Sequence, residues 1–290
     1  MHRAYTIGTC IWVASVVALF IGDRASAYVA LGVLAYSAVL VGFTLWLIPR
    51  SDAARESVLV ALPKSRVLAV IRWAIVAVDV AFVVLYGIAY GGIEGGIYVP
   101  VATPFIEALL RWQLPLLGSA QALFNFAILA LLPGLLLVAM GTAPRELGLT
   151  KSARGTLAAT AGCLLLPIVF IVVGFARGSV TVVRLIGLVV HNLFSNGFSE
   201  EFWSRGVVFS HLRSIASDEW ALIGQAIVFA LLHTGSTIAE EHYHWVLIFA
   251  NVIALNGPLA IALGVMALRG RSLVLPTIVH ISIDTMAHVL

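Results

Sequence analysis

The chain has 290 residues, of which 61% are hydrophobic and only 11% are charged, and its mean hydropathy is +1.05. Soluble domains carry roughly 25% charged residues, so this composition excludes an ordinary soluble domain and indicates an integral membrane protein. The net charge of +3 is spread over short loops, which is typical of a topology signal and not of a nucleic-acid-binding surface. Cys10 and Cys163 both lie in apolar runs and indicate neither a disulfide framework nor a thiolate metal site.

Nine apolar runs follow one another along the chain, and we predict that each forms a helix that enters or crosses the bilayer. No run shows the alternating pattern of a membrane β-strand. The predicted fold is therefore an all-α polytopic bundle of about eight to nine transmembrane helices. In chain order, the predicted spans are 5–22, 27–48, 67–90, 119–140, 156–176, 180–213, 219–234, 245–267 and 272–289.

The run 180–213 is too long for a simple span. As a single helix it would extend over about 51 Å, whereas the hydrocarbon core of a bilayer is about 30 Å thick. It must tilt, protrude or break, and the sequence SNG at 195–197 is the expected position of a break.

Basic residues are concentrated in every second loop. The basic loops 49–66, 141–155 and 268–271 contain Arg50, Arg55, Lys64, Arg66, Arg145, Lys151, Arg154, Arg269 and Arg271. Cytoplasmic loops carry an excess of lysine and arginine, so we predict a cytoplasmic N-terminus and an external C-terminus. If the source is a prokaryote, the expected location is the cytoplasmic membrane. The first apolar run is long, so we expect a retained helix and not a cleaved signal peptide.

Three charged residues stand close together in the run 180–213. Glu201 and Arg205 are four positions apart with the acid first, which favours an ion pair on one helix face. Glu200 lies about 100° around the helix from Glu201, so we expect it to remain as a second carboxylate that can act as a general base. The alternative is that all three residues form a salt-bridge cluster that only supports helix packing.

Two further segments place polar residues at a similar depth. The runs 180–213 and 219–234 would form an antiparallel hairpin, in which Glu200 and His233 are equally far from the turn. On the last helix, His280 and Asp284 are four positions apart and share a face. The spacing therefore permits one buried polar layer made by three helices.

Such a layer could hydrolyse a peptide bond. Glu200 would take a proton from a water molecule that His233 also holds, and His280 would donate to the developing oxyanion. Asp284 could orient His280. The same residue types could instead bind a divalent metal such as zinc, with Glu200, His233 and His280 as ligands. The chain has no H-E-x-x-H motif, so no cofactor is assigned with certainty.

Aromatic side chains flank these polar positions. Phe202, Trp203 and Phe229 could line a groove for a hydrophobic substrate, or they could be ordinary packing or lipid-facing residues.

Three short motifs resemble those of a known family. The segments EEFWSR at 200–205, FALLH at 229–233 and HISID at 280–284 are similar to E-E-x-x-x-R, F-x-x-x-H and H-x-x-x-N/D. In this order they resemble the CPBP family of CAAX prenyl proteases and bacteriocin-processing enzymes, also called the Abi family. The resemblance covers about residues 185–288.

The resemblance implies a bundle of about eight transmembrane helices around a polar cavity that faces the cytoplasm. It also implies that Glu200 and His233 activate water and that His280 and Asp284 form the oxyanion site. Prenyl proteases of the family remove three residues after a prenylated cysteine, and other members are implicated in bacteriocin maturation and self-immunity. The prenyl-protease branch has asparagine at the position of Asp284, which weakens a prediction of prenylated substrates.

The sequence therefore predicts an intramembrane endopeptidase that acts on a membrane-bound protein or peptide within the lipid bilayer, with no nucleic-acid partner. Two alternatives remain open: a non-catalytic membrane scaffold or immunity protein, and a transporter. We expect two regions, with N-terminal helices of unknown role in residues 1–155 and the protease-like core in residues 156–290. The substrate, the cleavage site and the oligomeric state do not follow from the sequence.

Overall fold

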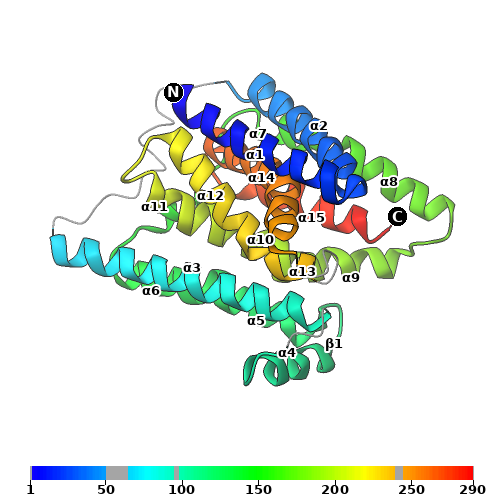
Figure 1. Ribbon diagram of the computed structural model, residues 1–290, viewed down its shortest axis with the longest axis horizontal. Coiled ribbons are helices and arrows are strands. Elements are labelled where there is room, and N and C mark those ends of the chain that lie inside the picture. Colours follow the sequence, from blue (N-terminus) through cyan, green and yellow to red (C-terminus); the bar gives the residue numbers. More distant parts are fainter. Residues whose placement is uncertain (1, 50–64, 95–97, 239–243, 290) are drawn as a thin grey trace. The chain divides into compact units, whose positions relative to one another are not determined.

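The computed structural model describes residues 2–49, 65–94, 98–238 and 244–289 (Figure 1). Several loop residues that carry the predicted topology signal, such as Arg50, Arg55, Lys64, Glu240 and Glu241, lie outside this part of the chain. The orientation in the membrane therefore stays a prediction.

The described residues form helices with one short hairpin. The elements up to residue 126 are α1 (His2–Gly22), α2 (Arg24–Leu47), α3 (Arg66–Glu94), α4 (Ala102–Arg111), β1 (Gln113–Leu114), β2 (Gly118–Ser119) and α5 (Ala120–Phe126). They are followed by the π-helical segment η2 (Ala127–Leu131), α6 (Leu132–Ala139), the 3₁₀ turn η3 (Pro144–Leu147), α7 (Thr156–Cys163) and α8 (Leu165–Ala176).

The C-terminal elements include two further π-helical segments. They are α9 (Val182–Asn192), η4 (Leu193–Gly197), α10 (Phe198–Glu201), η5 (Phe202–Phe209), α11 (Ser210–Leu212), α12 (Asp218–Leu232), α13 (Thr234–Ile238), α14 (Trp245–Gly270) and α15 (Val274–Ala287). The predicted helix 180–213 is thus continuous from α9 to α11, and η4 includes the SNG sequence at which we expected a break. π-helical turns are wider than α-helical turns and are frequent at functional sites.

The predicted all-α polytopic class is confirmed, although fewer helices than expected meet the length of a full span. Within the described residues, five helices are long and apolar enough to cross a membrane, and a sixth is possible if α7 and α8, which are bent by 43°, form one span. The difference has a physical reason: α12 has 15 residues and α15 has 14, whereas about 20 residues span a bilayer.

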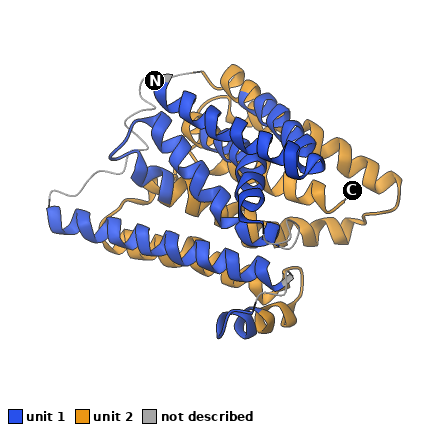
Figure 2. Cartoon of the chain, in the orientation of Figure 1, with its two compact units in different colours: residues 1–41, 61–106, 208–265 blue, residues 42–60, 107–207, 266–290 orange. Residues whose placement is uncertain are grey.

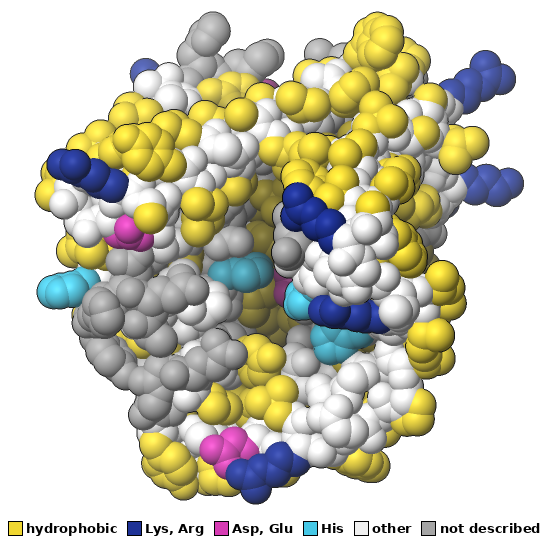
Figure 3. Space-filling model, turned by 90° about the vertical axis from the view of Figure 1, so that its right-hand side faces the viewer, with side chains coloured by type: hydrophobic (Ala, Val, Ile, Leu, Met, Phe, Trp, Pro, Cys, Tyr) yellow, Lys and Arg dark blue, Asp and Glu magenta, His cyan; other side chains and the backbone are white. Residues whose placement is uncertain are grey.

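Large apolar side chains remain exposed on these helices, among them Val78 and Leu85 on α3 and Leu165 and Val172 on α8. Figure 3 shows one face of the molecule on which hydrophobic side chains prevail. Exposed apolar surface of this extent is unfavourable in water and is what a helix in contact with lipid presents.

Residues 98–118 differ from the prediction, which assigned them no element. They form the ten-residue helix α4 and a hairpin in which Gln113 pairs with Ser119 and Leu114 with Gly118. Glu107 and Arg111 form an exposed ion pair of 2.8 Å on α4. A charged helix of this length is too short to span the bilayer, so a search for apolar runs does not detect it.

The chain divides into two compact units that do not follow chain order (Figure 2). Unit 1 consists of residues 1–41, 61–106 and 208–265, and unit 2 consists of residues 42–60, 107–207 and 266–290. The predicted regions 1–155 and 156–290 each contribute to both units, and their functional division stays a prediction.

Candidate active site

Unit 2 brings together five of the predicted site residues. Glu200 and Glu201 are the last two residues of α10, and Arg205 follows one turn later in η5. His280 and Asp284 lie one turn apart on α15. The site is therefore formed by two segments that are about 80 positions apart along the chain.

Glu201 is the centre of this cluster. Its Oε1 atom accepts a hydrogen bond of 2.9 Å from the guanidinium of Arg205, and neither side chain has any exposed surface. The same oxygen lies 2.8 Å from Nδ1 of His280. The structure thus contains the ion pair that the four-residue spacing predicts, and Glu201 joins this pair to α15.

The bond to Glu201 fixes the orientation of His280. An ionised carboxylate can only accept a hydrogen bond, so Nδ1 carries the proton and donates to Glu201. The opposite ring nitrogen, Nε2, then lies 3.9 Å from Oε2 of Glu200 and 3.7 Å from Oδ2 of Asp284. His280 therefore lies among three carboxylates, of which Glu201 orients the ring and the other two face its second nitrogen.

Asp284 has a partner that the sequence motifs did not reveal. The side-chain amide of Asn196 in η4 donates to Oδ2 of Asp284 over 3.2 Å. Asn196 is 88 positions from Asp284 and lies outside the three motifs. The only signal in the sequence was the helix-breaking SNG triplet, which gave no reason to pair Asn196 with α15.

His233 lies in the other compact unit, at the C-terminal end of α12. Its Nδ1 atom is 2.9 Å from the backbone carbonyl of Phe229, and its ring is 4.8 Å from the Phe229 ring, measured between centroids. Because a carbonyl accepts, Nδ1 carries a proton and donates this bond. The predicted alignment of His233 with Glu200 stays a prediction.

The three aromatic residues within the motif segments are buried. Trp203 has no exposed surface, and Phe202 and Phe229 are almost as fully covered. Phe202 packs against Phe198, with ring centroids 5.8 Å apart, and also fills the space next to Gly134. These contacts are those of core packing, and a role in lining a substrate groove stays a prediction.

The arrangement of the candidate metal ligands does not match a metal site among the described residues. Among the described residues, no group of three or more histidine, cysteine, aspartate or glutamate side chains is arranged so that it could hold a metal ion. In unit 2, Glu201 is already bonded to both Arg205 and His280. A zinc ion therefore stays a prediction from residue types alone.

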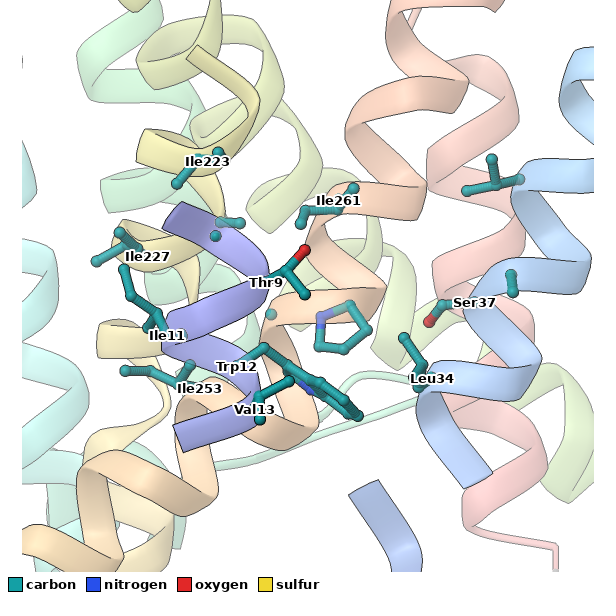
Figure 4. A pocket seen from close by; sticks show the side chains of 17 residues that line it. Thr9, Ile11, Trp12, Val13, Leu34, Ser37, Ile223, Ile227, Ile253 and Ile261 are labelled. Carbon is teal, nitrogen blue, oxygen red and sulfur yellow. The ribbon is translucent and has the colours of Figure 1, made fainter. Parts of the chain in front are cut away.

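Unit 1 contains an apolar pocket with a volume of about 380 Å³ (Figure 4). It lies between α1, α2, α12 and α14, and Trp12, Leu34, Ile223 and Pro258 are among its lining residues. No acidic, basic or histidine side chain lines it. Because acid–base chemistry needs such a group, this pocket is not a candidate for the reacting centre.

These observations define a class of protein: a helical membrane protein that contains a buried cluster of histidine, carboxylates and arginine. Residues 182–286 match the family model described as "Type II CAAX prenyl endopeptidase Rce1-like". This range contains all three motifs, so the resemblance seen in the sequence is confirmed for this part of the chain. Searches of curated proteins and of solved structures gave no match.

Proposed function

We propose that this protein is an intramembrane endopeptidase that hydrolyses a peptide bond in a membrane-associated protein or peptide. The observation that supports this proposal best is the position of His280, whose Nδ1 is 2.8 Å from Glu201 while its Nε2 faces Glu200 and Asp284. A positioned imidazole beside a carboxylate is suited to proton transfer and to oxyanion stabilisation. The match of residues 182–286 to a protease family adds independent support.

In the proposed reaction, Glu200 takes a proton from water, and the resulting hydroxide attacks the carbonyl carbon of the scissile peptide. The carbonyl oxygen becomes an oxyanion that His280 stabilises through Nε2–H, because in the proposed reaction His280 is the imidazolium and carries a proton on both ring nitrogens. Collapse of the tetrahedral intermediate breaks the C–N bond, and Glu200 returns its proton to the leaving amine. The role of His233 in holding the water is taken from the sequence alone, from its predicted depth and from the motif resemblance.

The proposed substrate class follows from the environment of the cluster. The side chains of Glu201 and Arg205 have no exposed surface, and they belong to a chain whose helices expose apolar side chains. Ionisable residues buried in such a chain mark a functional site, and a membrane-associated substrate suits its apolar surroundings. CAAX-type processing and bacteriocin- or immunity-related processing are both compatible with this class.

The test compares new peptide termini in membranes from host cells that carry the wild type or Glu200→Gln at equal abundance. Glu107→Gln is the matched control, because it makes the same chemical change in an exposed ion pair on α4. We expect a set of termini that is present with the wild type and the control and absent with Glu200→Gln. Their sequences would show whether a cysteine precedes the cut.

Identical termini for the wild type and Glu200→Gln, with both proteins inserted in the membrane, would contradict the proposal. The non-catalytic scaffold or immunity protein would then be the better explanation of the same fold.

A further inference from the structure

Asn196 and Asp284 form a pair that the proposed reaction has not yet used. The amide nitrogen of Asn196 donates to Oδ2 of Asp284 over 3.2 Å. The orientation of the amide follows from chemistry: a carboxylate only accepts, so Nδ2 and not Oδ1 must face it. Both residues are partly buried within unit 2.

The backbone that carries Asn196 is held from two sides. The side chain of Asn125 in α5 donates to the backbone carbonyl of Ser195 over 3.1 Å. On the other side, the amide of Asn192 donates to the hydroxyl of Thr285 on α15 over 3.3 Å. These two bonds, at position 195 and one turn earlier at position 192, hold the backbone before Asn196 against α5 and α15, so Asn196 is a pre-positioned group.

Gly197 allows the close approach of η4 to α15. A Cβ atom at this position would collide with the side chain of Ile281. The wider π-helical turn and the missing side chain together bring η4 against the face of α15 that carries His280 and Asp284.

Asp284 cannot stabilise an oxyanion itself, because an ionised carboxylate has no proton to donate and would repel the negative charge. Its Oδ2 atom is however close to two donors, Nδ2 of Asn196 at 3.2 Å and Nε2 of His280 at 3.7 Å. Asp284 thus binds the amide of Asn196 and brings it close to Nε2 of His280. Oxyanion sites usually present more than one positioned donor to the developing charge.

The amide of Asn196 has capacity for a second bond. Nδ2 carries two N–H groups, and within the described residues only the bond to Asp284 is made by this nitrogen. We infer that Asn196 is a catalytic residue of the proposed endopeptidase, which binds Asp284 with one N–H and donates the other to the carbonyl oxygen of the scissile peptide. Asp284 is the positioning residue that aligns this amide with His280. This inference rests on the proposed function.

The experiment measures the rate at which new peptide termini appear when purified variants are added to membranes from host cells that lack the gene. Several membrane concentrations separate the maximal rate from the half-saturating concentration. Asn196→Ala is expected to lower the maximal rate roughly 10²–10³-fold, the usual effect of removing one oxyanion donor, and to leave the half-saturating concentration unchanged. Ser282→Ala is the matched control on α15, because its hydroxyl bonds back to Ile278 on the same helix, and it should keep the wild-type rate.

Exchanging the side chains of Asn196 and Asp284 distinguishes a catalytic role of the pair from a purely structural one. Asn196→Asp places two carboxylates against each other and should lower both the maximal rate and the thermal stability. The double variant Asn196→Asp/Asp284→Asn restores an amide–carboxylate pair with the amide on α15, and we expect it to recover at least tenfold in rate over Asn196→Asp. Recovery of stability without recovery of rate would overturn the inference, because the pair would then serve only to hold the helices together.

The remaining outcomes distinguish this inference from the proposed function. If Glu200→Gln abolishes the new termini while Asn196→Ala keeps the wild-type rate, Asn196 is not a donor and the endopeptidase proposal stands. If neither Glu200→Gln nor Asn196→Ala changes the termini, the proposed function fails and the inference fails with it.

Discussion

Arg205 and Glu201 have different roles from Glu200 although the three residues lie within six positions. The Arg205–Glu201 ion pair has no exposed surface, and Glu201 also bonds His280. Removing one member of a buried pair leaves the other as an uncompensated charge, which costs about 3–5 kcal/mol. Glu200 lies farther from His280, at 3.9 Å, so its charge contributes less to holding the two segments together.

The first prediction follows from this difference. Arg205→Ala should lower the free energy of unfolding by about 3–5 kcal/mol and reduce the yield of folded protein, and Glu201→Gln should act in the same direction. Unfolding in detergent, followed by circular dichroism, measures the effect. Arg111→Ala is the matched control, because it breaks an exposed i,i+4 pair that is worth at most about 1 kcal/mol.

Glu200→Gln is the opposing case, since it should keep the wild-type yield while it abolishes activity. If Glu200→Gln alone fails to assemble in detergent, the assignment of Glu201 and Arg205 as the structural pair and of Glu200 as the reacting base is wrong.

Sequence reasoning predicted the contacts that depend on local spacing and missed those that depend on the third dimension. The Glu201–Arg205 pair follows from four-residue spacing on one helix. The bond from Asn196 to Asp284 depends on how η4 packs against α15. Neither residue's neighbours in the sequence reveal that packing, so the pair was not foreseen.

At the scale of the helices, the π-helical segments are the feature that the sequence did not predict. A proline removes one backbone donor from a helix and crowds the preceding turn, and Pro133 is the second residue of α6, the helix that follows η2. η4 has no proline. Its wider turn occurs where Gly197 lies close to Ile281 and where side-chain bonds connect η4 and its neighbour Asn192 to α5 and α15. The positions of the long helices could be read from apolar periodicity, whereas the local widening could not, because it depends on neighbouring helices.

The second prediction concerns this close contact. Gly197→Ala should destabilise the protein by about 1–3 kcal/mol, the usual cost of inserting an atom into a filled space. It should also lower the proposed activity, because η4 would move away from α15 and take Asn196 with it. Thermal unfolding and the rate of formation of new peptide termini provide the two measurements.

Gly187→Ala provides the control for the effect of alanine in the same run of helices. Position 187 lies inside α9, and a Cβ atom there would have no neighbour within 4 Å. This change should be neutral or stabilising by about 0.5–1 kcal/mol. Equal effects of the two substitutions would show that the contact with Ile281 does not matter.

At the scale of the whole molecule, each compact unit is made of segments that lie far apart in the sequence. Unit 2 combines the last 25 residues with residues 107–207 and a segment near residue 50. Apolar runs indicate where the long helices lie, but not which helices pack together, because nearly every face of such a helix is apolar. The sequence placed His280 in one layer with Glu200, whereas the 2.8 Å bond between His280 and Glu201 was not predicted.

The last prediction concerns how the chain crosses the membrane between residues 151 and 177. If α7 and α8 form one bent span, Lys151 and Arg177, which are both exposed, lie on opposite sides. By the excess of basic residues in loop 141–155, Lys151 is cytoplasmic. In a variant with Cys10 and Cys163 replaced by alanine, Arg177→Cys should react with a membrane-impermeant thiol reagent in intact cells, and Lys151→Cys should react only after lysis. Reaction of both positions in intact cells would mean that the 43° bend marks a re-entrant pair. The reverse pattern would instead place the N-terminus outside, because the same number of crossings would then begin from the other side.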